Sequence, residues 1–272
     1  MNINTANEVI LEAKNLVKTY SQSSGRFGFG QTQIRALDHV SIALKAGTTL
    51  AVVGESGSGK STLARCLLQL QSYDSGNVIF AGQDLAQLDK QGLCAVRKNL
   101  QMVFQDPFAS LNPRMRVGEI IGEGLLIHAL GTAAEQKNKV LQMLERVGMS
   151  ADDAQKYPHQ FSGGQRQRIG IARALVLQPQ VVVCDEPVSA LDVSVQAQIL
   201  ILLKDLQKEM NLSYIFISHD LRVVRHIADE MVVMHQGKIV EKGQVKDIYN
   251  APQQVYTQQL LNAIPGRSAV LN

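Results

Sequence analysis

Runs of apolar residues that end in polar or glycine-rich segments recur along the chain and predict buried strands. TLAVV (49–53) leads into a glycine-rich segment, and QVVVCDE (180–186) is a continuous apolar run closed by two acids. SYIFISHD (213–220) has the same form and also ends in polar residues. Unbroken apolar runs of this length are typical of parallel strands that are covered on both faces.

Helical spacing follows two of these runs. Leu63, Leu67 and Leu70 recur at helical spacing behind the first run. Behind the second run, one face of a helix is marked by Val195, Ile199, Leu202, Leu206 and Met210. Strands that alternate with helices predict an α/β fold with a mostly parallel sheet flanked by helices. Ligands bind such sheets at the carboxyl ends of the strands.

Two strand-rich stretches lie outside this alternation. VILEAKNLVKTY and IRALDHVSIALKAG, near the N-terminus, predict strands of a separate antiparallel sheet. The glycine- and serine-rich residues 21–31 between them predict an exposed loop. Residues 231–243 predict a hairpin around Gln236 and Gly237.

A mostly helical stretch interrupts the alternation in the middle of the chain. It covers residues 91–170, and Val140, Leu144 and Val147 share one helix face within it. The predicted organisation is a core with an antiparallel β subdomain (1–90 and 171–247), a helical insertion (91–170) and a C-terminal helical tail (248–272).

Composition narrows the class of protein without naming a function. The chain has 272 residues, 45% apolar and 19% charged, which suits a globular protein. A net charge of +3 is too small to predict a nucleic-acid surface. No stretch reaches the roughly 18 unbroken apolar residues that predict a membrane span. The three cysteines lack the paired spacing of a zinc site or a disulfide framework.

The segment GESGSGKST lies between the first apolar run and the first helical stretch. It fits the phosphate-binding pattern G-x-x-x-x-G-K-[ST] in the strand-to-helix context that this pattern requires. Glycines let the backbone wrap closely, so that N–H groups and the helix dipole face the phosphates. Lys60 would reach the β- and γ-phosphates, and Ser61 would ligate Mg²⁺. A glycine turn without a ligand is the alternative, which the context disfavours. The predicted nucleotide-binding residues are Gly54, Glu55, Ser56, Gly57, Ser58, Gly59, Lys60, Ser61 and Thr62.

Two acids close the second apolar run. Asp185 ends the predicted strand, where a carboxylate can hold Mg²⁺ directly or through water. Because side chains alternate along a strand, Glu186 is expected to point away from Asp185. One carboxylate for the metal and another to align or deprotonate water is what phosphoryl transfer to water requires.

Three single residues carry weaker signals. His219 ends the third apolar run, where a buried structural role and a γ-phosphate contact are both open. Gln105, in MVFQDP, lies where the core passes into the helical insertion and would by itself be a surface-loop residue. Tyr20 precedes the exposed loop and would either stack on an adenine ring or pack against its neighbours.

FSGGQRQR (161–168) is a second turn suited to phosphate. Ser162 and the two glycines after it open a predicted helix, whose positive end would face an anion. A helix N-cap with glycines is the alternative. The residues themselves leave open whether this turn serves the same nucleotide as Lys60 or a different one.

In their order and spacing, GESGSGKST, VFQDP, FSGGQRQR, VVVCDEP, SALD and SHD resemble the motifs of ATP-binding-cassette ATPases. The resemblance covers nearly the whole chain, and the SGGQ motif is diagnostic of that family. It implies two nucleotide domains that pack head to tail, with each ATP between the P-loop of one and the signature turn of the other. The signature residues implied to contact the neighbour's ATP are Ser162, Gly163, Gly164 and Gln165.

The same resemblance implies roles for single residues. Tyr20 would stack on adenine, and Asp192 in SALD would lie at the dimer interface. The residues implied at Mg²⁺ are Ser61, Gln105 and Asp185. Those implied in hydrolysis are Glu186, His219 and Gln105, with Gln105 sensing metal and water and His219 contacting the γ-phosphate. The implied ligands are ATP and Mg²⁺.

Within the family, VFQDPFASLNPRMRVGEII, the insertion at 21–31 and the tail look like the ATPases of oligopeptide and dipeptide importers. The implied partners are a second ATPase subunit (in a homodimer or heterodimer), integral membrane permease subunits and, indirectly, a substrate-binding protein, but no nucleic acid. The chain would then lie peripherally at the cytoplasmic face of the membrane. Alternatives are an importer of nickel complexes or antimicrobial peptides, a soluble cassette ATPase in DNA repair or translation, and an adenylate-binding regulator without turnover.

Three residues, in two segments, depart from the family pattern. Phe161 stands where many members have leucine, and a large apolar residue should pack there equally well. Gln254 and Val255 stand where relatives usually have His-Pro.

Overall fold

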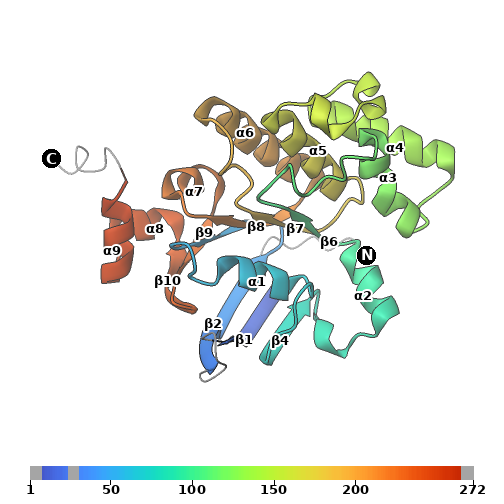
Figure 1. Cartoon of the computed structure of the whole chain (residues 1–272). Coiled ribbons are helices and arrows are strands. Elements are labelled where there is room, and N and C mark those ends of the chain that lie inside the picture. Colours follow the sequence, from blue (N-terminus) through green and yellow to red (C-terminus); the bar gives the residue numbers. More distant parts are fainter. Residues whose placement is uncertain (1–7, 24–30, 265–272) are drawn as a thin grey trace. The chain divides into compact units, whose positions relative to one another are not determined.

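The structure, a computed structural model, describes residues 8–23 and 31–264. The chain divides into two compact units. The first unit comprises residues 1–88 and 215–272, and the second comprises residues 89–214. In Figure 1 the colours of the second unit run from turquoise through green and yellow to orange.

An antiparallel sheet lies in the first unit, as predicted. Its strands are β1 (Val9–Ser23), β2 (Gln31–Lys45), β4 (Ser75–Phe80) and β5 (Gln83–Asp84), in the order β2-β1-β4-β5. Strands β1 and β2 extend into the predicted loop 21–31, of which residues 24–30 lie outside the described residues.

The other strands of the first unit follow the order β10-β9-β3-β8. They are β3 (Thr49–Val53), β8 (Ser213–Ser218, which begins at the end of the second unit), β9 (Glu230–His235) and β10 (Lys238–Gln244). Strand β3 is parallel to β9, and β9 is antiparallel to β10. The predicted hairpin is confirmed, because the turn between β9 and β10 has positive φ at Gln236 (47°) and Gly237 (78°).

Helices complete the first unit. They are α1 (Lys60–Leu67), the 3₁₀ helix η1 (Leu85–Gln87), α7 (Leu221–Ile227), α8 (Val245–Asn250) and α9 (Val255–Asn262). Leu63 and Leu67 are fully buried, as the spacing predicts. The prediction is wrong for Leu70, which lies beyond the end of α1 and is 53% exposed. Helices α8 and α9 bury Val245, Ile248 and Leu261 against β3, β9 and α7.

The second unit combines two parallel strands with most of the helices. The strands are β6 (Leu100–Val103) and β7 (Val181–Asp185). The helices are α2 (Lys90–Arg97), α3 (Val117–Ile127), α4 (Ala133–Arg146), α5 (Gly163–Leu175) and α6 (Val193–Met210), with 3₁₀ helices η2 (Ala151–Gln155) and η3 (Pro158–Gln160). Strand β6 lies in the stretch that was predicted to be mostly helical. It was not predicted, because four residues are too few to give a periodic signal.

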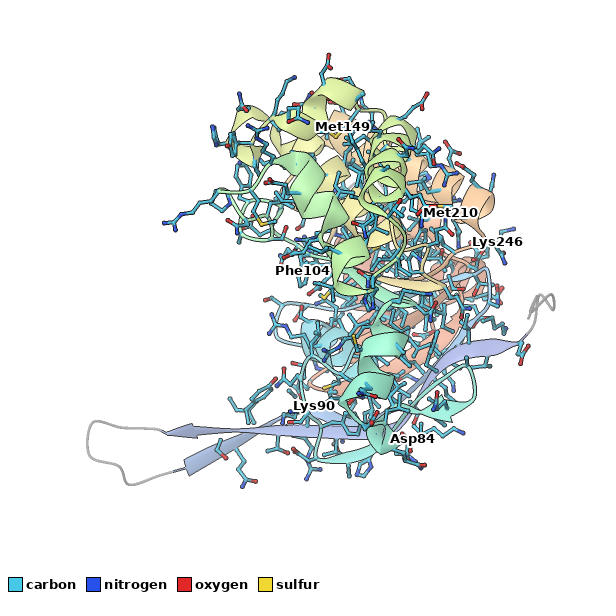
Figure 2. All side chains as sticks on the ribbon, turned by 90° about the vertical axis from the view of Figure 1, so that its right-hand side faces the viewer. Asp84, Lys90, Phe104, Met149, Met210 and Lys246 are labelled. Atoms are coloured by element: carbon cyan, nitrogen blue, oxygen red, sulfur yellow. The ribbon has the colours of Figure 1, made fainter. Side chains whose placement is uncertain are left out.

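Helices α3, α4 and α5 pack on one another in the second unit (Figure 1). Met149, which follows α4 and is labelled in Figure 2, is buried in this unit. The predicted face of α4 is confirmed, because Val140, Leu144 and Val147 are buried. On α6, Ile199 and Leu206 are buried as predicted, but Leu203 is buried in place of the predicted Leu202. The fold class predicted from the sequence, α/β with an added antiparallel sheet and a helical part, is confirmed.

Candidate nucleotide-binding site

The glycine loop connects β3 to α1, in the context that the sequence pattern requires. All five residues of β3 are buried, and α1 begins at Lys60. Positive φ angles occur at Gly54 (149°), Gly57 (82°) and Gly59 (107°). A Cβ atom at Gly54 would lie 2.2 Å from the Met234 carbonyl oxygen, so the loop packs against β9 too closely for any side chain.

Lys60 is the charged group at the centre of this loop. Its side chain is only 5% exposed, and its Nζ donates hydrogen bonds of 2.8 Å to the carbonyl oxygens of Gly54 and Glu55. The ammonium group is therefore held inside the loop at the N-terminus of α1. A positive charge together with loop and helix N–H groups suits a phosphate.

Two distant segments of the first unit hold the outer side of the loop, and the sequence reasoning missed both. In the β9–β10 turn, Gly237 N donates to Ser58 O over 3.0 Å. From α9, the Tyr256 hydroxyl accepts a hydrogen bond of 3.1 Å from Glu55 N. No local pattern marks either contact, since Tyr256 lies 201 residues from Glu55 in sequence.

The acids at the end of β7 are supported within the second unit. Asp185 is only 5% exposed, and Glu186 follows the last strand residue with φ 46°. Gln105 Nε2 donates a hydrogen bond of 2.9 Å to Glu186 Oε2. Glu186 was expected to point away from Asp185 because side chains alternate along a strand. That reason is wrong, because Glu186 lies in a left-handed turn that follows the strand.

The signature turn forms the start of α5. Ser162 is the N-cap residue: its hydroxyl accepts from Gln165 N over 3.3 Å, and Gln165 Oε1 accepts from Ser162 N over 3.0 Å. A Cβ atom at Gly164 would lie 2.5 Å from Val195 Cγ1 of α6. Phe161 is 6% exposed and packs as expected.

Asp192 caps the next helix, α6. It accepts hydrogen bonds from Val195 N (3.0 Å) and Ser194 Oγ (2.7 Å). The bond from Ser194 and the backbone N–H groups lower the pKa of Asp192, so the exposed carboxylate stays ionised.

Residues 37–189, more than half of the chain, match the family described as ABC transporter. The chain belongs to the ABC transporter family.

Individual relatives of this ABC transporter chain cover most of its length. The dipeptide transport ATP-binding protein DppF of Haemophilus influenzae is 52% identical over 95% of this chain and 79% of the relative. The oligopeptide transport ATP-binding protein AppF of Bacillus subtilis is 51% identical over the same shares. The dimeric ATP-binding cassette MJ0796, solved in a post-hydrolysis state with ADP and Pi, superposes with a TM-score of 0.77 at 29% identity, covering 87% of this chain and 99% of that one.

The predicted site residues of this ABC transporter chain are distributed over both units. Tyr20, the glycine loop and His219 belong to the first unit, and Gln105, the two acids, the signature turn and Asp192 to the second. His219 is exposed, which contradicts a buried structural role. Tyr20 is 37% exposed, and its hydroxyl accepts a hydrogen bond from Gln71. The ligand contacts of these side chains stay predictions.

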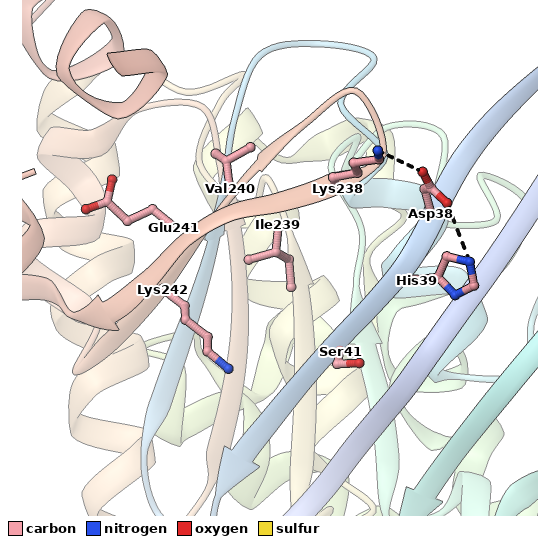
Figure 3. A pocket seen from close by; sticks show the side chains of 8 residues that line it. All are labelled: Asp38, His39, Ser41, Lys238, Ile239, Val240, Glu241 and Lys242. Carbon is pink, nitrogen blue, oxygen red and sulfur yellow. Dashed lines mark ion pairs between the residues drawn. The ribbon is translucent and has the colours of Figure 1, made fainter. Parts of the chain in front are cut away.

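None of the residues that line the hollow in Figure 3 belongs to the glycine loop. The hollow lies between β2 and β10 in the first unit and has a volume of about 540 Å³. Three of the side chains that line it lie together: Asp38 forms an ion pair with Lys238 (3.2 Å) and lies 3.9 Å from His39. This ABC transporter chain has no helix among residues 8–23 and 31–264 that is both long and apolar enough to cross a bilayer.

Proposed function

We propose that this chain is the ATP-hydrolysing subunit of an ABC importer for oligopeptides or dipeptides. The observation that carries ATP binding is the glycine loop, with three positive-φ glycines leading into α1 and the Lys60 ammonium held inside. The names of the relatives, which are transport ATP-binding proteins for dipeptides and oligopeptides, support peptides as the cargo.

Phosphate binding is the task of the first unit. Lys60 exchanges its carbonyl partners for the β- and γ-phosphate oxygens, while the loop N–H groups and the N-terminus of α1 complete the cradle. Ser61 and Thr62 add hydroxyl groups at the start of α1. Tyr20 stacks on the adenine ring.

Hydrolysis uses Glu186, which aligns the attacking water and accepts its proton. The hydrogen bond from Gln105 orients the carboxylate for this task. His219 contacts the γ-phosphate. Through this hydrogen bond, a change at Glu186 during turnover would be transmitted to the surface around Gln105.

Mg²⁺ fits the residues assigned to it. No group of three His, Cys, Asp or Glu residues that could hold a metal occurs within the described part of the chain. Mg²⁺ is bound in such sites by one or two protein oxygens, water and substrate phosphates rather than by an all-protein cage. Ser61, Gln105 and Asp185 supply hydroxyl, amide and carboxylate oxygens, and the ion would neutralise phosphate charge.

A second ATPase subunit completes the site, with Ser162, Gly163, Gly164 and Gln165 of each chain facing the neighbour's ATP. The dimeric state of the similar cassette MJ0796 supports this arrangement. Because a γ-phosphate exists only before hydrolysis, its loss would loosen the dimer. Asp192 lies at the same interface.

Membrane permease subunits dock on the second unit, near Gln105. The two neighbouring aromatic residues there are exposed, Phe104 by 41% and Phe108 by 58%. The Arg166 guanidinium lies over the Phe108 ring, 4.0 Å from its centre. An aromatic residue beside arginine is a typical centre of a protein interface. The chain then acts peripherally at the cytoplasmic face of the membrane.

The ATPase assignment is tested with Glu186→Gln. We expect unchanged ATP binding, a fall in kcat of at least about 100-fold, which is the size of a lost general base, and an ATP-dependent dimer in size-exclusion chromatography. Glu145→Gln, the same change on the exposed surface of α4, is the matched control and should retain full activity. Normal turnover by Glu186→Gln would exclude this residue as the base.

The shared site is tested with Ser162→Arg, which should stop hydrolysis while a single chain still binds ATP. Loss of binding to the isolated chain would contradict the arrangement across two subunits. Lys60→Ala should lose ATP binding outright.

Permease docking is tested by recovery of membrane proteins from detergent extracts. Phe108→Asp should lose them, whereas Ile201→Asp, at a residue of α6 that is 62% exposed, should retain them. Recovery of ribosomes or DNA instead would favour a soluble machine. Peptide import is tested by growth of a strain that lacks this gene, with dipeptides or oligopeptides as its amino-acid source. The wild-type gene should restore growth, and the Glu186→Gln variant should not.

A further inference from the structure

The C-terminal helix α9 contacts the phosphate loop through one side chain, Tyr256. Its hydroxyl accepts the hydrogen bond from Glu55 N, and its ring packs against His235, with 4.0 Å between the ring centres. His235 is the last residue of β9 and leads into the turn whose Gly237 contacts Ser58. The loop is therefore held by two connected elements.

The two peptide groups that join Glu55 to its neighbours Gly54 and Ser56 are fixed from several sides. Glu55 O accepts from Lys60 Nζ (2.8 Å) and from Ser58 N (3.2 Å), while Glu55 N donates to Tyr256. The Glu55 N–H is therefore bound to Tyr256 and held in a fixed place in the loop. It acts as the anchored end from which the following N–H groups are directed.

Helix α9 is itself firmly packed on the first unit, so it can hold the loop in place. Thr257 and Leu261 are fully buried, and Tyr256 packs at the edge of the cluster that contains Ala51 and Val53 of β3. The entry to α9 is held by the Glu241 carboxylate, which accepts from the backbone N–H groups of residues 253 (2.8 Å) and 254 (3.2 Å). Burial raises the pKa of Tyr256, which keeps its hydroxyl neutral.

We propose that Tyr256 is a positioning residue for nucleotide binding: its hydroxyl holds the Glu55 peptide and so keeps the phosphate loop in the shape that accepts a triphosphate. The proposal rests on the proposed ATP site at Lys60. It makes the tail helix part of the nucleotide site, although Tyr256 touches neither the substrate nor the reacting atoms.

The test compares Tyr256→Phe with Tyr249→Phe in the full-length chain. Both changes remove one hydroxyl from the tail, but the Tyr249 hydroxyl donates to Leu221 O of α7 instead of contacting the loop. Because the loop holds the ground state and the transition state alike, Tyr256→Phe should raise the KM and the Kd for MgATP about 2- to 10-fold, the size of one net hydrogen bond. Its kcat should stay within about twofold of wild type. Tyr249→Phe should leave the KM unchanged.

The outcomes separate this inference from the proposed function. Absence of ATP binding by the wild-type chain would contradict the proposed function. If the wild-type chain binds ATP and Tyr256→Phe has an unchanged KM, the role of Tyr256 is overturned while the proposed function stands. Equal KM changes in both variants would also overturn this role, because they would indicate a general loss of packing around α8 and α9. Tighter ATP binding by Tyr256→Phe would also overturn it, since the hydroxyl would then compete with phosphate.

Discussion

The two glycines of the signature turn should respond differently to alanine, although they are neighbours at the start of α5. A Cβ atom at Gly164 would lie 2.5 Å from Val195 Cγ1, closer than non-bonded carbon atoms approach. At Gly163 the nearest atom would be Leu191 Cδ2 at 3.5 Å, an ordinary van der Waals contact. The same substitution thus meets a clash at one position and open packing at the next.

The magnitudes decide which effect dominates. Helix propensity favours alanine over glycine by about 0.5–1 kcal/mol at either position. Overpacking at Gly164 costs about 1–3 kcal/mol. The Val195 methyl group cannot swing away, because a β-branched side chain in a helix has one strongly preferred χ1 rotamer. Gly164→Ala should therefore lower the free energy of unfolding by about 1–2 kcal/mol, and Gly163→Ala should leave it unchanged or raise it slightly.

Urea unfolding followed by circular dichroism measures both changes. The double variant Gly164→Ala with Val195→Ala should recover stability relative to the sum of the single changes, with an interaction of about 0.5–3 kcal/mol. Equal stability of the two alanine variants would refute the steric reasoning. So would a Gly164→Ala effect that Val195→Ala leaves unchanged.

Two further predictions concern titratable groups. Burial by itself raises the pKa of Asp153, but Lys156 Nζ at 2.7 Å and Ser150 N at 3.0 Å outweigh it and lower the pKa below its usual value. The stabilisation by Asp153 should therefore be complete above the unfolded pKa of about 3.9 and be lost as pH falls through the lower folded pKa. The stability difference between wild type and Asp153→Asn should follow the same course, and a difference that stays constant in acid would contradict it. Burial also raises the pKa of Cys66 to about 11 and that of Cys184 to about 12, whereas Cys94 is exposed. A thiol reagent at pH 8 should react rapidly only with Cys94 in the native chain and with all three cysteines after unfolding; a rapid reaction that persists in Cys94→Ser would disprove this.

The motifs could be predicted from the sequence because each is encoded within one short segment. Gly54, Gly59 and Lys60 take their places from their own spacing between β3 and α1, and Ser162 caps α5 through residues three positions away. Elements that such local patterns predict are found in the structure, because residues close in sequence stabilise them. The hairpin at Gln236 and Gly237 was predictable for the same reason.

Contacts between distant segments were decided by the tertiary structure alone. Gln105 and Glu186 are 81 residues apart in sequence, and Tyr256 and Glu55 are 201 apart. Leu70 continues the helical spacing of apolar residues in the sequence, but α1 ends before it and its side chain is exposed. Periodicity describes which face of an element is apolar, but chain topology determines which segments meet, and a hydrogen bond between distant residues leaves no pattern in either segment. The sequence therefore determined the phosphate loop, the acids and the signature turn, and the fold determined what holds them in place.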